Sequence, residues 1–300
     1  MIMRQLCEDP KRGKDFLYRQ LRSNDGIYHN ILEYVINDNE LDLQIRENYI
    51  NVYYKGGNIL KLKPKSYDID IMYFQYDANV KSKDIKSDKT KLKLLEKERE
   101  VLIDLLPKNP QEYFIKAKKV MDRWDFAMSE RKQHNEKKEQ QEIAIANRKN
   151  SDYIVLDLEY AVSQNSLFKY NGNKGKKVPR FDIIAIHNGQ LVIIELKKGL
   201  GAIGGESGIE PHMDCFNATI GRDTQGLFMR EMRDLLRQKK ALGIIADNVE
   251  ISDAKPKFVF AFADEEGNDD FDKFVEKCRE QKYYDDILYI DINHKIQQRL

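Results

Sequence analysis

Three charged residues bracket two neighbouring apolar segments of the chain: Asp182 stands early in the first segment, and Glu195 and Lys197 end the second. The Asn188-Gly189 pair between the segments is typical of a tight hairpin turn. Alternation along a strand puts Glu195 and Lys197 on one face, and the hairpin brings Asp182 beside them. We therefore expect two carboxylates and an ammonium group to gather at one edge of an apolar sheet.

Two carboxylates a few ångströms apart repel each other, and a divalent cation removes that repulsion. Magnesium is a hard ion that takes one or two carboxylates, water and substrate phosphate as ligands. We expect Mg²⁺, or Mn²⁺ in its place, to bind Asp182, Glu195 and the backbone carbonyl of Leu196. Such an ion lowers the pKa of a bound water and neutralises charge on a phosphodiester. Lys197 would orient the attacking water or stabilise the phosphorane that forms.

This pattern resembles the PD-(D/E)xK nuclease superfamily, whose core is a helix, three strands, a helix and a strand. The resemblance covers about residues 129–263. It implies an α/β fold with a restriction-endonuclease-like αβββαβ core, Asp182 and Glu195 as metal ligands and Lys197 as the catalytic lysine. It also implies metal-dependent hydrolysis of nucleic acid, DNA in preference to RNA. The chain departs from the family pattern in one respect, because Pro179 lies three positions before the acid instead of next to it.

The tripeptide Asp/Glu-x-Lys is common in a chain this charged and occurs seven times. The Glu195 copy alone follows a four-residue apolar run and a preceding strand that holds an acid. The strands around the Glu195 motif, and not the tripeptide alone, therefore indicate a metal site. Two other interpretations stay open: an ordinary ion pair at a sheet edge, and an inactive nuclease fold that binds nucleic acid or a protein partner.

Members of the superfamily often add a glutamate from the first core helix. Glu142 is our first candidate, because it stands where the polar run 129–141 turns apolar. Glu139 is the second. Asp157 and Glu159 share one face of the first strand and are an alternative source of the third acid.

Positive charge gathers in two segments that could bind phosphate. Residues 169–180 carry five basic residues and no acid, and a predicted helix over about 222–242 carries an arginine stripe. A solvated loop and a solvated helix face are the alternative interpretations. The residues that we expect to contact nucleic acid are Lys174, Lys176, Lys177, Arg180, Lys198, Arg230, Arg233 and Arg237.

Two further features lie just beyond the Glu195 strand. The glycine-rich segment 199–208 is interpreted as a flexible loop that admits substrate or as a structural turn. His212 and Cys215 follow it, and we interpret them as incidental, because no partner set completes a catalytic triad.

Hydrophobic periodicity divides the chain into an accessory region, 1–127, and a nuclease-like domain, 128–300. The accessory region is predicted to contain two short helices within 15–37, an antiparallel meander, a helix over 91–106, and one long or two shorter helices over 111–149. The predicted meander strands are 41–45, 49–54, 59–62 and 69–74. In the second domain the predicted strands are 152–162, 180–187, 190–197, 257–263 and 287–292.

The chain has 300 residues, 41% of them hydrophobic, with 51 basic and 50 acidic side chains. No apolar run approaches the roughly 20 residues of a membrane span, and no N-terminal stretch resembles a secretory signal, so we expect a cytoplasmic protein without a membrane partner. The three cysteines show no Cys-x-x-Cys spacing. Homodimerisation is compatible with the sequence, and the accessory region is open to a role in protein binding.

Overall fold

The computed structural model describes residues 20–24, 26, 28–46, 49–64, 66–75, 88–129, 132–161, 180–198, 208–224, 226–263, 270–281 and 287–298. The chain forms two compact units, which divide between Gln141 and Glu142. This division falls inside helix α6 (Lys132–Ala146), downstream of the boundary expected at residue 127. Below, the N-terminal unit ends at Gln141 and the C-terminal unit begins at Glu142.

The N-terminal unit combines a small antiparallel sheet with helices. Its four strands lie in the order β1-β2-β3-β4. Their bounds are β1 (Asp42–Ile45), β2 (Ile50–Tyr54), β3 (Gly57–Lys63) and β4 (Ser66–Asp68), and the helices are α2 (His29–Asn37), η1 (Ile71–Phe74), α4 (Lys89–Ile103) and α5 (Pro110–Met128).

Residues 69–74 were expected to form a strand, and this prediction is wrong. Ile71–Phe74 is a 3-10 helix, because the Asp70 carboxylate accepts the backbone N–H of Met72 at 2.9 Å and caps the turn. The segment 111–149 forms two helices, α5 and α6, as one of the two open interpretations had it.

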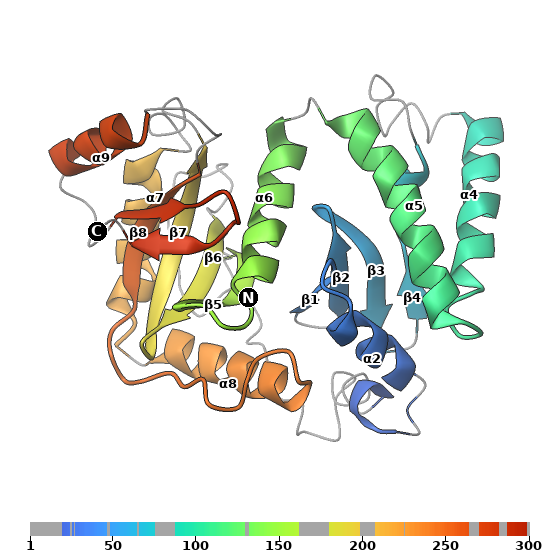
Figure 1. Ribbon diagram of the computed structural model, residues 1–300, viewed down its shortest axis with the longest axis horizontal. Coiled ribbons are helices and arrows are strands. Elements are labelled where there is room, and N and C mark those ends of the chain that lie inside the picture. Colours follow the sequence, from blue (N-terminus) through green and yellow to red (C-terminus); the bar gives the residue numbers. More distant parts are fainter. Residues whose placement is uncertain are drawn as a thin grey trace. The chain divides into compact units, whose positions relative to one another are not determined.

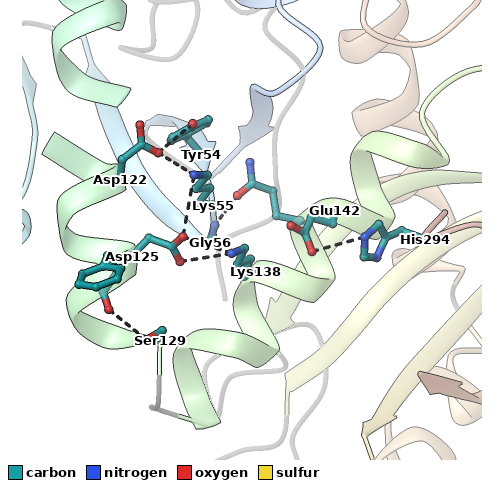
Figure 2. Close-up of polar contacts among 11 residues, drawn as sticks. Tyr54, Lys55, Gly56, Asp122, Asp125, Ser129, Lys138, Glu142 and His294 are labelled. Carbon is teal, nitrogen blue, oxygen red and sulfur yellow. Dashed lines mark hydrogen bonds and ion pairs between the residues drawn. The ribbon is translucent and has the colours of Figure 1, made fainter. Parts of the chain in front are cut away.

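Helix α5 is tied to the β2–β3 hairpin by a polar cluster (Figure 2). Lys55 Nζ lies 2.7 Å from Asp122 Oδ1 and 4.0 Å from Asp125 Oδ2. The Tyr54 hydroxyl donates to the same Asp122 oxygen at 3.0 Å, and burial followed by Asp122 raises the pKa of that hydroxyl. Lys55 and Gly56 both adopt positive φ, at 47° and 73°, the conformation that a two-residue hairpin turn requires.

The C-terminal unit is built on one six-stranded sheet in the order β10-β9-β8-β7-β6-β5 (Figure 1). Strand β8 runs parallel to both β7 and β9, and the other pairs are antiparallel. The strands are β5 (Tyr153–Ala161), β6 (Arg180–His187), β7 (Gln190–Lys198), β8 (Lys257–Ala263), β9 (Ile287–Ile290) and β10 (Ile296–Gln298), and the helices beyond α6 are α7 (Ile209–Ala218), η3 (Ile220–Arg222), α8 (Leu227–Ala241) and α9 (Asp270–Gln281).

Helices and strands are thus mixed along the chain, and the expected α/β class is confirmed at that level. The predicted strands 180–187 and 257–263 coincide with β6 and β8. Helices α7 and α9 and strand β10 were not anticipated.

The central strands separate two kinds of core. On one face, aliphatic side chains such as Ile194, Leu196 and Ala261 form a cluster that includes Ile143 and Ala144 of α6. The other face is aromatic. Phe258 stacks on Phe216 of α7 with ring centroids 5.1 Å apart, and Phe262 contacts Phe274 of α9 at 4.8 Å.

Candidate functional site

The turn between β6 and β7 sets the register of the site. Asn188 and Gly189 have φ values of 48° and 79°, so both central residues are left-handed, as the sequence predicts for this pair. Cross-strand pairing runs from His187 with Gln190 to Ile183 with Ile194. The next residues along the two strands are Asp182 and Glu195, which stand just past the last cross-strand pair, at the far end of the hairpin.

Asp182 ends the backbone ladder between these strands. Its Oδ2 atom accepts the backbone N–H of Leu196 at 2.9 Å, a group that a continued ladder would pair with a carbonyl of β6. The side chain thus takes the place of a backbone acceptor where the two strands part. Asp182 is only 6% exposed, so a carboxylate is fixed within the sheet at this point.

Glu195 and Lys197 form a buried ion pair on β7. Lys197 Nζ donates to Glu195 Oε1 at 2.9 Å, and each side chain is 4% exposed. The two residues pair with Phe260 and Phe262 of parallel β8, so both side chains point to the aromatic face. The expectation that alternation places Glu195 and Lys197 together is confirmed.

Helix α7 adds a histidine to this pair. His212 Nε2 lies 3.0 Å from Glu195 Oε1, and the His212 side chain is 11% exposed. The other ring nitrogen, Nδ1, lies 2.8 Å from the Gly208 carbonyl oxygen at the start of the helix. His212, interpreted as incidental from the sequence, therefore contacts the motif glutamate. The available signal was its place on the next helix after the Glu-x-Lys strand.

The charges around Glu195 keep this carboxylate ionised. Burial raises its pKa, but the Lys197 ammonium and the hydrogen bond and charge of His212 outweigh that effect, so the pKa is lowered below its ordinary value of 4.5. One oxygen, Oε1, receives both Lys197 and His212. The other, Oε2, is buried and has no hydrogen-bond partner in the part of the chain that the structure describes. A buried ionised oxygen without a partner is costly, so a cation or hydrogen-bond donor that bound Oε2 would remove that cost.

This lowered pKa gives a prediction for stability in metal-free protein. A carboxylate with a depressed pKa stabilises the fold at pH values above its ordinary pKa, and the stabilisation is lost as pH falls through the depressed value. We expect the free energy of unfolding to fall below about pH 4.5 less steeply in Glu195→Gln than in the wild type. Urea denaturation across acid pH measures this, and equal slopes would contradict the ionised assignment.

The candidate third acids lie in different surroundings. Glu142 Oε2 is 3.7 Å from His294 Nε2, which belongs to the turn between β9 and β10 (Figure 2). Glu139 belongs to the N-terminal unit. Glu159 pairs with Arg180 at 3.0 Å. Asp157 is fully buried and pairs with Ile184, on the face that also carries Glu195, so it is the best placed of the four.

Among the described ligand atoms, those of Asp182, Glu195 and His212 do not all lie within 4.8 Å of one another. The structure therefore presents Glu195 and His212 as a close pair, and Asp182 stands on the neighbouring strand β6, where it accepts the Leu196 N–H. A cation held by one or two carboxylates, with water completing its shell, fits such an open arrangement.

The arginine stripe of α8 is largely neutralised within the unit. Arg233 Nη2 lies 2.6 Å from Asp253 Oδ1, Arg237 lies 3.7 Å from Asp234, and Lys240 lies 2.7 Å from Glu250. Arg230 is exposed. The phosphate contacts expected here would have to compete with these acids.

Of the remaining residues predicted to contact nucleic acid, one lies in a described strand and three lie in a segment that the structure does not describe. Lys198 ends β7 and is half-buried. Lys174, Lys176 and Lys177 lie outside the described residues, as does most of the glycine-rich segment.

Comparisons with protein families, with curated protein sequences and with solved structures give no match for this chain. Across the part of the chain that the structure describes, no helix combines the length and apolar character that crossing a bilayer requires. The case for a function therefore depends on the residues and geometry of the Asp182–Glu195–Lys197–His212 site.

Proposed function

We propose that this protein is a metal-dependent nuclease that hydrolyses phosphodiester bonds of nucleic acid, DNA in preference to RNA, with water as the nucleophile. The observation that carries the proposal is the buried Glu195 carboxylate, which is held ionised by Lys197 while its Oε2 atom lacks a partner. A purely structural ion pair would be expected to satisfy both oxygens, because a half-satisfied buried charge is destabilising.

The residues present fit a divalent cation. Glu195 Oε2 is a hard oxygen donor with no hydrogen-bond partner among the described residues. Asp182 and Glu195 each stand one residue past the last pair of β6 with β7. With the carbonyl of Leu196 these groups would hold Mg²⁺ or Mn²⁺. Such an ion supplies Lewis-acid stabilisation of the phosphodiester and a water of lowered pKa.

Each side chain of the site has a distinct role in this proposal. Lys197 donates a hydrogen bond to Glu195 and keeps it charged, and its ammonium group would stabilise the negative charge that develops on phosphate. Asp182 is immobilised by Leu196 N–H, so its carboxylate is positioned before any ligand arrives. Burial strengthens these electrostatic interactions, because little water screens them.

The order of elements supports the same proposal. The end of α6, the antiparallel strands β5, β6 and β7, the helices α7 and α8, and β8 parallel to β7 follow one another along the chain. The PD-(D/E)xK resemblance implies a helix, three strands, one helix and a strand, and this chain has α7, η3 and α8 where the resemblance implies one helix. The basic residues Arg180, Lys198 and Arg230, with the lysines of 174–177, are our proposed phosphate contacts.

The test is cleavage of supercoiled plasmid, linear duplex DNA and single-stranded RNA by the full chain, with Mg²⁺ or Mn²⁺ and with EDTA. We expect divalent-dependent cleavage, with DNA as the better substrate. Asp182→Asn and Glu195→Gln, which preserve side-chain volume, should each reduce the cleavage rate by about a hundredfold or more, since each removes an ionised ligand. Thermal melting confirms that the variants are folded.

Glu250→Gln is the matched control, because Glu250 forms a surface ion pair with Lys240 in the same unit. It should cleave as the wild type does. Folded Asp182→Asn and Glu195→Gln proteins with wild-type cleavage would refute the catalytic assignment. DNA binding without any divalent-dependent product would identify a binding module instead.

A further inference from the structure

His212 has the arrangement of a metal-ligating histidine. Its Nδ1 atom lies 2.8 Å from the Gly208 carbonyl oxygen, which can only accept a hydrogen bond, so Nδ1 carries a proton. Histidines that bind a metal through one ring nitrogen commonly donate the other N–H to a backbone carbonyl, which fixes the tautomer and the ring orientation. The Gly208 contact therefore leaves Nε2 as the nitrogen that faces the site.

The Nε2 atom faces a carboxylate, which accepts hydrogen bonds or binds cations but donates no proton when ionised. Glu195 Oε1 lies 3.0 Å away, and the same oxygen already accepts from Lys197. At this separation either a proton on Nε2 that is donated to Oε1, or a cation bound to both atoms, must lie between the imidazole and the carboxylate. Two ligands of one octahedral ion with bonds of about 2.1 Å are separated by about 3 Å. The observed separation suits a shared cation.

An independent observation points to a ligand at the same carboxylate. The Glu195 side chain is only 4% exposed, and its Oε2 atom has no hydrogen-bond partner among the residues that the structure describes. A cation that binds here would give Oε2 a partner. It would also bridge the His212 Nε2 atom and the Glu195 carboxylate. Burial raises the pKa of the Cys215 thiol, one turn farther along α7, to about 12, so this thiol is protonated in the metal-free protein.

We propose that His212 is a protein ligand, together with Glu195, of the divalent cation, and that the site therefore prefers a transition-metal ion such as Mn²⁺ to Mg²⁺. This inference depends on the cation of the proposed function. Imidazole nitrogen is a poor ligand for Mg²⁺ and a good one for first-row transition ions. A site of carboxylate and carbonyl oxygens alone would lack this preference.

The test measures metal binding by metal-free, full-length protein without nucleic acid. Mn²⁺ is titrated by electron paramagnetic resonance, and pulsed spectra report whether a nitrogen-14 nucleus is coupled to the bound ion. We expect nitrogen coupling in the wild type and its loss in His212→Gln and His212→Ala. Mn²⁺ affinity should fall about 10- to 100-fold in these variants, while Mg²⁺ affinity, from competition, should change by less than about threefold.

His187→Asn is the matched control, because His187 lies at the turn end of β6, opposite the site end. It should keep both the nitrogen coupling and the Mn²⁺ affinity. Coupling that is absent from the wild type, or that persists in folded His212→Ala, would overturn the proposal, as would failure of Mn²⁺ to bind. Nitrogen coupling without nucleic-acid cleavage would refute the proposed nuclease function alone, and cleavage without coupling would refute the role of His212 alone.

Discussion

Lys197→Met is expected to lower the free energy of unfolding of the C-terminal unit by about 3–5 kcal/mol in metal-free protein. The variant leaves the buried Glu195 carboxylate without the ammonium group that lies 2.9 Å from it. Loss of one member of a buried ion pair costs far more than loss of the whole pair, because the remaining charge stays desolvated. Chemical denaturation in EDTA measures the change.

Two further variants make this prediction specific. The double variant Glu195→Leu with Lys197→Met should regain most of the lost stability, since no uncompensated charge remains. Lys240→Met removes an ion pair of the same unit whose glutamate, Glu250, is 78% exposed, and should cost no more than about 1 kcal/mol. Equal destabilisation by Lys197→Met and Lys240→Met would show that the Glu195 pair is not desolvated.

Asn147→Ala is expected to lower the free energy of unfolding by about 3–4 kcal/mol, because several buried groups lose a hydrogen-bond partner together. Asn147 is fully buried just after α6. Its Nδ2 atom donates to the carbonyls of Ile143 and His294, at 2.8 and 2.7 Å, and its Oδ1 atom accepts the N–H of Ile296 at 3.2 Å and the hydroxyl of Ser151 at 2.7 Å. The side chain thus joins the helix end to the β9–β10 hairpin.

Ser151→Ala is the matched control for Asn147, because it removes one of these hydrogen bonds and leaves the others. It should cost about 1 kcal/mol. Hydrogen exchange would locate the effect: Asn147→Ala should increase exchange at β10, whereas Ser151→Ala should not. A cost for Asn147→Ala no greater than that for Ser151→Ala would show that the hairpin does not depend on this side chain.

Much of the fold could be predicted where the signal was local. The Asn188-Gly189 turn and the apolar runs on both sides specify β6 and β7, because turn geometry and alternation act over neighbouring residues. The prediction of a strand at 69–74 was wrong for an equally local reason. Asp70 caps a 3-10 helix there, and the hydrophobic pattern gives no sign of such a cap. Helix α7 is short and follows a glycine-rich segment, so its helical hydrophobic periodicity was not recognised in the sequence.

The site was predictable in part. Glu195 and Lys197 lie two residues apart on one strand, so their contact follows from strand geometry. His212 reaches Glu195 through the packing of α7 on the aromatic face, a tertiary relation that spacing along the chain does not encode. For the same reason Asp157 and Glu159 could be separated only by the pairing of β5 with β6. Two acids that pair with the basic residues of α8, Asp253 and Glu250, come from the segment between α8 and β8.

The β6–β7 turn fixes the register of the two strands, and that register determines where Asp182 and Glu195 lie at the opposite end of the hairpin. Two equal arms of five paired residues extend from it, and Asp182 and Glu195 stand just past their tips. One residue inserted in either arm would turn one carboxylate toward the aliphatic cluster while the other stayed in place. The distance between Asp182 and Glu195 along the chain is therefore as constrained as their identities, and homologous sequences with this chemistry should tolerate insertions outside these arms but not within them.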